Sequence, residues 1–153
     1  MSEFSVRVAT PSDIAELAGL FDAYRQFYEQ EPDLALAHKF LQERFDRQES
    51  LVLVACNQDA EAVGFCQLYP SFCSVDAAPI FSLYDLFVSS SCRQRGVGRL
   101  LLMAAEKQAK LRGKVRMDLT TAKTNKSAQS LYESLGWVRD EIFFAYSRRL
   151  PVN

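Results

Sequence analysis

The first part of the chain combines one short strand pattern with a helical one. Residues 5–9 alternate between polar and apolar as a strand does, and residues 10–13 supply a capping threonine, a proline for the first helical position and an acidic residue for the first turn. Apolar residues then recur at three- and four-residue spacings, which predicts a helix with one face against a core. This face consists of Ile14, Leu17, Ala18, Phe21 and Tyr24.

A second helix is expected from Asp33 to Arg47, because Pro32 ends the first one. Its apolar positions again have helical spacing, so we expect a second buried face. The residues of this face are Leu34, Ala37, Phe40, Leu41 and Phe45.

After residue 50 the pattern becomes that of strands. Residues 51–56 and 62–69 read as two strands around a turn, which predicts an antiparallel hairpin, and a loop that contains Pro70 and Pro79 separates them from the next strand. The remaining expected strands lie at 80–88, 115–120 and 143–147. A helix is expected from Gly98 to Arg112, and its inward residues are Leu101, Leu102, Ala105 and Ala109. A last helix is expected at 125–135, where Gly136 ends it.

This order of elements, β-α-α-β-β-β-α-β-α-β, predicts an α/β (α+β) domain in which helices pack on a mixed sheet. The chain has 153 residues and contains no repeat, linker or charge block. A domain commonly has about 100–200 residues. We therefore expect one domain that spans residues 1–153.

Charge and composition exclude several classes of protein. Lys plus Arg (18) nearly balances Asp plus Glu (19), which argues against binding of nucleic acid or an anionic membrane through bulk charge. No apolar run approaches the ~20 residues of a membrane span, and the N-terminus has no secretory signal pattern. We therefore expect a cytoplasmic protein.

The cysteines and the single histidine indicate no metal site. No Cys-x-x-Cys pair occurs among the four cysteines, which are Cys56, Cys66, Cys73 and Cys92. With only one histidine, the usual set of zinc ligands is therefore absent. Free thiols are expected, although four cysteines also permit two disulfides. His38 has no nucleophile beside it and is expected to be solvated or structural.

A glycine-containing loop between a strand and a helix is the first candidate for chemistry. Gly96 and Gly98 allow close approach of a ligand, the first N–H groups of the helix lack intrahelical partners, and Arg93, Arg95 and Arg99 add positive charge. A phosphorylated ligand is the prediction, with a plain tight turn as the alternative. The Rossmann pattern would need glycine where Leu101 stands, and the Gly-Lys-Ser/Thr end of a P-loop is absent.

A second segment, residues 125–137, carries a further candidate. Asn125 is a residue type that caps helices, and Tyr132 lies two helical turns beyond it on the same face. By periodicity alone, Tyr132 is equally a half-buried aromatic residue.

Together the two segments resemble the GNAT superfamily of acetyl-CoA-dependent N-acetyltransferases. The motifs are Arg93-x-x-Gly96-x-Gly98 after Leu86-Phe87-Val88, and Asn125-x-x-Ala128-x-x-Leu131-Tyr132-x-x-Leu135-Gly136-Trp137. The resemblance covers nearly the whole chain and implies a mixed, mostly antiparallel sheet flanked by about four helices. It implies acetyl-CoA as cofactor and acyl transfer to an amine in a ternary complex.

The resemblance also assigns residues to the cofactor and the acid. The strand residues Leu86, Phe87 and Val88 would contact the pantetheine arm, Asn125 would contact the cofactor arm with its side chain, and Tyr132 would be the general acid. The pyrophosphate would lie against Arg93, Gln94, Arg95, Gly96, Val97, Gly98 and Arg99.

The chemistry also needs a base, because a protonated amine cannot attack a thioester. Asp85 is the nearest carboxylate and could accept the proton directly or through water, and the alternative is a structural ion pair with an arginine. Polyamine acetyltransferases of this family are similar at residues 84–88 but carry glutamate at the position of Tyr84. Ser90 and Gln94 also depart from the family's common proline and glycine.

We expect the acceptor to bind near the end of the first helix. Tyr24, Tyr28 and Tyr84 are the candidate contacts, since aromatic and acidic residues together suit a cationic amine, and the alternative is a buried aromatic seam. Similar members include a yeast histone and polyamine acetyltransferase and bacterial relatives that often dimerise, so a homodimer is expected. Small amines or amino acids and protein lysines or N-termini remain open as acceptors, and an acyl-CoA-binding sensor without turnover is the alternative function.

Overall fold

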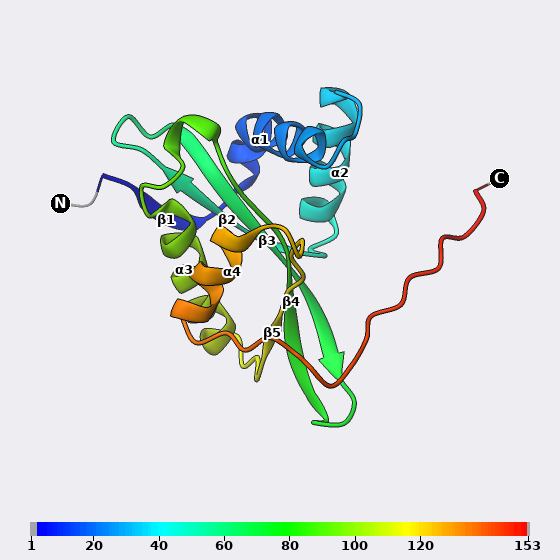
Figure 1. Cartoon of the computed structure of the whole chain (residues 1–153). Helices are drawn as coiled ribbons and strands as arrows, with labels where there is room; N and C mark the ends of the chain where they lie inside the picture. The colour runs from blue at the N-terminus through cyan, green and yellow to red at the C-terminus, as the bar shows by residue number, and fades with distance from the viewer. Residues whose placement is uncertain (1–2, 153) are drawn as a thin grey trace. The chain divides into compact units, whose positions relative to one another are not determined.

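A five-stranded sheet forms the centre of the computed structural model, which describes residues 3–152 (Figure 1). The strands follow the order β1-β2-β3-β4-β5, with antiparallel pairs throughout except for the parallel pair of β4 and β5. The sheet is therefore mixed and mostly antiparallel, as expected. The strands are β1 (Ser5–Val8), β2 (Leu51–Cys56), β3 (Ala62–Cys73), β4 (Ala78–Val88) and β5 (Met117–Asp118).

The helices begin at the capping residues that the sequence indicates. The Asp33 carboxylate accepts a hydrogen bond from the Leu36 N–H (3.0 Å), and Asn125 Oδ1 accepts one from the Ala128 N–H (3.2 Å). The helices are α1 (Ile14–Phe27), α2 (Leu34–Asp46), α3 (Val97–Leu111) and α4 (Lys126–Ser134), with short 3₁₀ turns η1 (Pro11–Asp13) and η2 (Ser90–Cys92).

The described chain divides into two units, and each is described here by itself. Unit 1 extends to Thr120 and holds the sheet with α1, α2 and α3, whereas unit 2 begins at Thr121 and holds α4. The expectation of a single domain over the whole chain stays a prediction. Within the part of the chain that the structure describes, no helix has both the length and the apolar character to cross a membrane.

The helices α1 and α2 cover one face of the sheet in unit 1. The predicted face of α1 is confirmed, since Ile14, Leu17, Ala18 and Phe21 are buried and Tyr24 packs against them. The predicted face of α2 is confirmed in part: Leu34 is wrong, because it lies in the first turn and is 56% exposed. Strand side chains complete this cluster, among them Val52, Val54, Phe65 and Phe87.

The helix α3 lies on the opposite face and approaches β3 closely at Gly64. A Cβ at this glycine would lie 2.9 Å from the Phe87 carbonyl oxygen and within 3.5 Å of Val97 and Leu101. A side chain at this position would therefore clash with the backbone of β4, and its Cβ would already be in van der Waals contact with α3. The predicted inward residues of α3 are confirmed as buried: Leu101, Leu102, Ala105 and Ala109.

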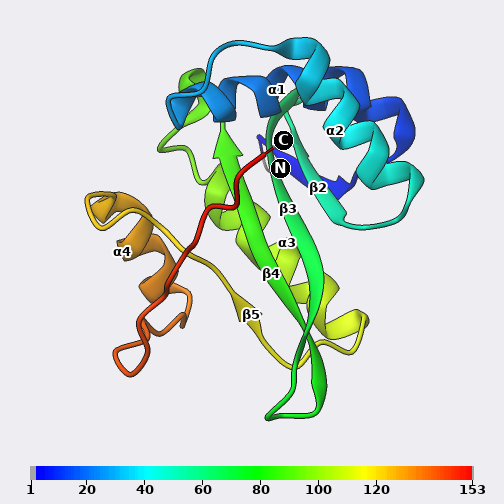
Figure 2. The ribbon, with the colours of Figure 1, turned by 90° about the vertical axis from the view of Figure 1, so that its right-hand side faces the viewer.

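The predicted loop around Pro70 and Pro79 is wrong, because β3 and β4 continue through both prolines as one long hairpin (Figure 2). Pro70 pairs with Phe81, whose N–H donates to the Arg116 carbonyl of the segment leading into β5. The Phe81 N–H therefore points away from β3, and the backbone nitrogen of Pro70 points away from β4 in the same way. Because Pro70 would not bond to β4 at this position, its missing N–H breaks no hydrogen bond between the two strands.

The predicted strand at 143–147 is also wrong. The described residues from 143 to 147 have no regular secondary structure and no ladder partner, and each is exposed. An apolar alternating pattern becomes a strand only when a second strand takes up its backbone hydrogen bonds. The predicted strand at 115–120 is likewise reduced to the short β5.

The cysteines are free thiols, as expected. Cys56, Cys66 and Cys92 are buried, and Cys73 is partly exposed. Burial raises the pKa of the Cys66 thiol to about 12.

The junction between β1 and α1 is fixed by one carboxylate. Asp13 accepts hydrogen bonds from both Arg7 Nη atoms (2.7 and 2.8 Å) and from the Thr10 N–H (2.7 Å). The hydrogen bonds from Arg7 are the main reason that the pKa of Asp13 falls to about 2.

We expect Asp13→Asn to lower the free energy of unfolding by about 1 kcal/mol at pH 7, a usual cost of losing a helix-start carboxylate. The pKa of Asp13 is below that of an unfolded aspartate (about 3.9), so its stabilisation is complete above that value and is lost as the pH falls toward about 2. Urea unfolding from pH 7 to pH 2 measures this difference. Asp59→Asn, at an exposed turn, serves as the control, and a difference that did not shrink at low pH would contradict the assignment.

Candidate active site

A β-bulge in β4 places Asp85 in the interior of unit 1. Gln67 of β3 pairs with Asp85 and the next residue, Leu68, pairs with Leu83, so Tyr84 is the extra residue of the bulge. Asp85 is only 5% exposed. Asp85 is thus a buried carboxylate near the end of β4, next to the bulge.

The buried carboxylate is held by polar side chains from three elements. Gln67 Nε2 donates to Asp85 Oδ2 (2.8 Å), and Ser50 Oγ donates to Gln67 Oε1 (2.8 Å). Burial raises the pKa of Asp85, although hydrogen bonds from Gln67 and Tyr24 oppose the rise. The hydrogen-bond donor to Asp85 is therefore a neutral amide, and among the described residues no arginine forms the ion pair that was the alternative.

Four tyrosines gather around the bulge. The Tyr24 hydroxyl donates to the Tyr84 carbonyl (3.4 Å), and the Tyr24 and Tyr28 rings meet edge to face at 5.1 Å. The Tyr69 and Tyr84 rings form a second edge-to-face pair at 5.7 Å. Burial and the nearby Asp85 raise the pKa of Tyr24, whereas Tyr84 is mostly exposed. The structure therefore brings together all three predicted acceptor residues beside the predicted base.

Beyond the bulge, one edge of β4 is open within unit 1. The strand β5 pairs with β4 only at Phe81 and Ser82. The Ser89 N–H donates to the Val63 carbonyl (2.8 Å), so Ser89 bonds toward β3. Successive residues of a strand direct their backbone groups to opposite sides, and those of Leu86 and Val88 therefore point to the open edge. Two predicted cofactor contacts therefore have the orientation that backbone binding needs.

The loop after β4 has an unusual backbone. Gln94 and Gly96 both have positive φ values, 61° and 85°, and Gly96 immediately precedes α3. No atom lies within 4 Å of the place that a Gly96 Cβ would occupy. The loop therefore presents its backbone, and the first N–H groups of α3 at Val97 and Gly98, without a covering side chain.

The arginines of this loop are directed to different partners. Arg93 Nε donates to the Val88 carbonyl (3.0 Å), which folds its side chain back over the end of β4. Arg95 forms an ion pair with Glu3, and Arg99 is exposed in the first turn of α3. The side chains of Arg93 and Arg95 thus bind protein groups in this structure.

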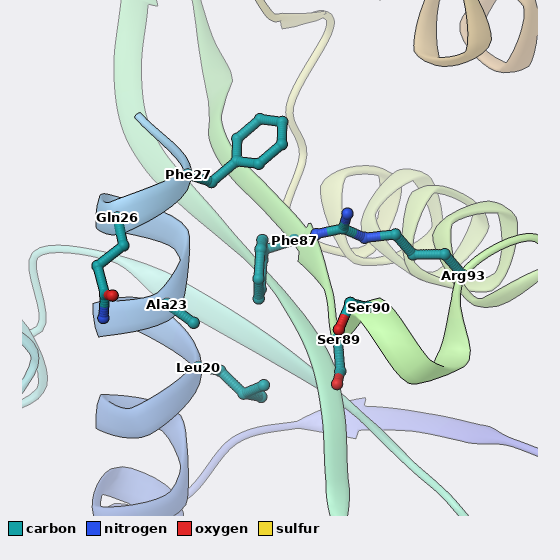
Figure 3. A pocket seen from close by; sticks show the side chains of 8 residues that line it. All are labelled: Leu20, Ala23, Gln26, Phe27, Phe87, Ser89, Ser90 and Arg93. Atoms are coloured by element: carbon teal, nitrogen blue, oxygen red, sulfur yellow. The ribbon is translucent and has the colours of Figure 1, made fainter. Parts of the chain in front are cut away.

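A cleft of about 380 Å³ lies between α1 and the end of β4 (Figure 3). The Arg93 guanidinium carbon lies 5.6 Å from the centre of the Phe27 ring and 5.5 Å from that of Phe87. An apolar cleft with one guanidinium suits a flexible chain that carries an anionic group. Its lining residues are Leu20, Ala23, Gln26, Phe27, Phe87, Ser89, Ser90 and Arg93.

Unit 2 carries the two remaining candidates on α4. Asn125 caps the helix with its side-chain oxygen, which leaves its NH₂ group for another partner. Tyr132 is half-buried and its ring lies 6.1 Å from that of Trp137.

Sequence reasoning missed three residues of this site. Gln67 lies two residues after Phe65, on the same face of β3, so a polar residue at an inward position was the available signal. Ser50 and Phe27 carried no comparable signal, because their roles depend on packing between distant elements.

Comparison with known proteins identifies the family of this chain. Residues 17–137 match the model of the Acetyltransferase (GNAT) family. An uncharacterized N-acetyltransferase of Bacillus subtilis, YhfO, is 42% identical over 96% of this chain and 98% of its own length. The crystal structure of a probable acetyltransferase has a TM-score of 0.90 at 34% identity and covers 97% of this chain and 99% of that one. The structure of AAC(6')-Iy with the bisubstrate analog CoA-S-monomethyl-acetylneamine has a TM-score of 0.78 at 25% identity, over 97% of this chain and 100% of that one. The chain belongs to the GNAT family and is an acetyl-CoA-dependent N-acetyltransferase.

Proposed function

We propose that this acetyltransferase moves the acetyl group from acetyl-CoA directly to an amine, with Asp85 as the base. The observation that carries the proposal is the buried carboxylate at the bulge of β4, beside a strand edge that is open to a ligand. A carboxylate is seldom buried without an arginine or lysine partner unless it has a function.

The residues of unit 1 fit the acetyl donor. The open backbone groups of Leu86 and the N–H of Val88 suit an amide-containing arm, with Phe87 beside them, and the loop from Arg93 to Arg99 suits a pyrophosphate. Gly96 supports this fit, because the space beside its Cα is empty. In unit 2, the NH₂ group of Asn125 is the further proposed contact. The donor supplies an acetyl group activated as a thioester.

Asp85 removes the proton from the attacking amine, directly or through a water molecule. The raised pKa of Asp85 makes it a stronger base than an ordinary aspartate, which brings it nearer to the amine's own range. Gln67 and Tyr24 hold the carboxylate in place as positioning residues.

Tyr132 donates a proton to the departing thiolate. An ordinary tyrosine, with a pKa of about 10, is matched to a thiolate of similar basicity. A backbone N–H of β4 near Leu86 stabilises the negative charge that develops on the carbonyl oxygen.

The acceptor is a cationic amine that binds among Tyr24, Tyr28 and Tyr84. The exposed Tyr84 ring and the half-exposed Tyr28 ring offer π faces to a cation, and Glu29 and Glu31 are exposed at the end of α1. Small amines, amino acids and the lysines or N-termini of peptides all carry this group.

A panel of amines tests the function. With acetyl-CoA present, we expect free thiol to appear only when an acceptor is added, because the acetyl group is transferred and not hydrolysed. The panel contains polyamines, amino acids, aminoglycosides and a lysine peptide, and thiol release is read colorimetrically. Acetyl-CoA binding in a calorimeter without release for any amine would instead favour a binding module without turnover.

Tyr132→Phe tests the acid. We expect kcat to fall about 10²-fold, the usual contribution of general acid catalysis, while the affinity for acetyl-CoA changes little. Initial rates give kcat and calorimetry gives the affinity. Tyr146→Phe removes an exposed hydroxyl from the same unit as the control. Full turnover by Tyr132→Phe at neutral pH would eliminate the assignment.

Asp85→Asn tests the base. We expect kcat/KM to fall about 10²-fold, and the acid limb of the wild-type pH profile, with its midpoint above the ordinary aspartate value of about 3.9, to disappear. Rates from pH 5 to pH 9 with one amine from the panel measure both effects, and Asp59→Asn is the control. An unchanged acid limb in Asp85→Asn would show that another group is the base.

The same variant separates lost chemistry from lost folding. Because the pKa of Asp85 is higher in the folded chain than in the unfolded one, its ionisation penalises the native state as the pH rises through the folded value. Asn lacks this penalty, so we expect Asp85→Asn to be at least as stable as wild type at pH 7 in urea unfolding. A marked loss of stability would mean that reduced activity reports misfolding.

A further inference from the structure

Two of the three buried polar side chains in the described part of the chain contact each other. The three are Asp22, Gln67 and Asp85. Asp22 has a structural role, because its carboxylate accepts a hydrogen bond from the Asp33 N–H (2.9 Å) just before α2. Gln67 is fully buried on the same face of β3 as Phe65, which belongs to the apolar cluster. An amide at such a position is costly to bury unless its hydrogen bonds are made.

The Gln67 side chain is the middle of a row of hydrogen bonds that crosses three strands. Gln67 pairs with Val52 of β2 on one side and with Asp85 of β4 on the other. Ser50 precedes Val52 by two residues and therefore lies on the same face. Ser50 Oγ donates to Gln67 Oε1 (2.8 Å), and Gln67 Nε2 donates to Asp85 Oδ2 (2.8 Å). The row thus joins a half-buried hydroxyl to the carboxylate beside the bulge.

The two ends of an amide act on a carboxylate in opposite ways. With Nε2 toward Asp85, the Gln67 amide donates a hydrogen bond and favours the ionised carboxylate. If the amide were turned by 180°, its oxygen would lie against the carboxylate. Two acceptors at that distance repel each other unless the carboxyl group holds a proton. The orientation of one buried amide thus decides which protonation state of Asp85 is favoured.

The Ser50 hydroxyl supports the orientation that the structure shows. Because it donates to Oε1, both ends of the Gln67 amide have partners while Asp85 is ionised. Without the hydroxyl, the same orientation would leave Oε1 buried and unpaired, which is unfavourable. Turning the amide would satisfy Oε1 only when a protonated Asp85 donates to it. Loss of the hydroxyl would therefore favour the protonated carboxyl group, which cannot act as a base.

We propose that Ser50 is a positioning residue for the acetyl transfer: by binding Gln67 Oε1 it directs Nε2 to Asp85 and keeps the carboxylate ionised and able to accept a proton. The inference rests on the proposed role of Asp85 as the base. Ser50 acts through Gln67 and needs no contact with either substrate.

The other titratable groups around Asp85 do not replace this control. They are Tyr24 and Tyr28 of α1, Cys66 and Tyr69 of β3, Tyr84 of β4, and Arg44 and Glu49 near the end of α2. Burial raises the pKa of Tyr24, Cys66 and Tyr69, so these groups are neutral at neutral pH. Arg44 and Glu49 form an ion pair (3.0 Å), so their charges oppose each other. Ser50 therefore acts on Asp85 through the neutral amide.

A matched pair of substitutions tests this role. Threonine and valine have nearly the same shape, and only threonine keeps a hydroxyl. We expect Ser50→Val to raise the pKa of Asp85 by about 0.5–1, the equivalent of one net hydrogen bond, and Ser50→Thr to leave it unchanged. Carboxyl-carbon NMR of aspartate-labelled protein over a pH series reads this pKa directly, and Asp85→Asn identifies the signal.

The pH profile of the transfer supplies a second measurement. With one amine from the panel, we expect the acid limb of kcat/KM in Ser50→Val to move to higher pH by the same amount. The rate at high pH should change little, because Asp85 is ionised there in both proteins. A loss of packing alone would lower the rate at every pH without moving the limb. Ser71→Ala, at an exposed position of β3, is the control.

The two measurements separate this inference from the proposed function. An Asp85 signal that titrates alike in Ser50→Val and wild type would overturn the role of Ser50, whatever the rates show. A raised pKa of Asp85 with an unmoved acid limb would uphold the action of Ser50 on Asp85 and would contradict the choice of Asp85 as the base. The smaller substitution Ser50→Ala should behave as Ser50→Val does, which guards against a misfit of valine.

Discussion

The unequal pairing of the two edges of β4 is the constraint on which unit 1 depends. One edge is paired to β3 along nearly its whole length, whereas the other meets β5 only at Phe81 and Ser82. The first edge fixes the strand firmly enough to carry a bulge, and the second leaves backbone groups for a ligand. The loop before α3 continues from the same strand, so the bulge, the open edge and the loop keep fixed positions relative to one another. A shift of β4 by one residue would exchange Asp85 for Tyr84 on the inner face.

Burying a carboxylate in an apolar sheet lowers stability, and the surrounding residues limit that loss. Gln67 receives a hydrogen bond from Ser50 and gives one to Asp85, so both polar atoms of the buried Gln67 side chain have a partner. Neutral partners satisfy the carboxylate without cancelling its charge, whereas an arginine would have held the pKa low and made the group a weaker base. A neutral amide donor is thus consistent with a group that must gain and lose a proton.

Local patterns predicted the elements that depend on local interactions. Helix starts followed from capping residues such as Asp33 and Asn125, and the faces of α1 and α3 followed from periodicity. The prediction that Leu34 is buried was wrong, because residues in the first turn of a helix often point to solvent even when their spacing fits the apolar face. The partner of Asp85 could not be predicted, since it depends on the register between β3 and β4 and on the bulge at Tyr84. The prediction of a strand at 143–147 was wrong for a related reason. An alternating pattern indicates that a segment can pair with another strand, but it does not show that a partner strand is present.

The two prolines of the β3–β4 hairpin have a consequence for solubility. Beyond Leu68 this hairpin has no β2 beside it, and its tip exposes Phe72 and Val75. Such an arm would ordinarily be a template for fibrous aggregation. Pro70 removes a hydrogen-bond donor from the outer edge of β3, and the outer side of Pro79 is occupied by the Val115 N–H. A foreign strand that approached the arm would find the row of donors interrupted, so the hairpin can project from the sheet without recruiting other chains.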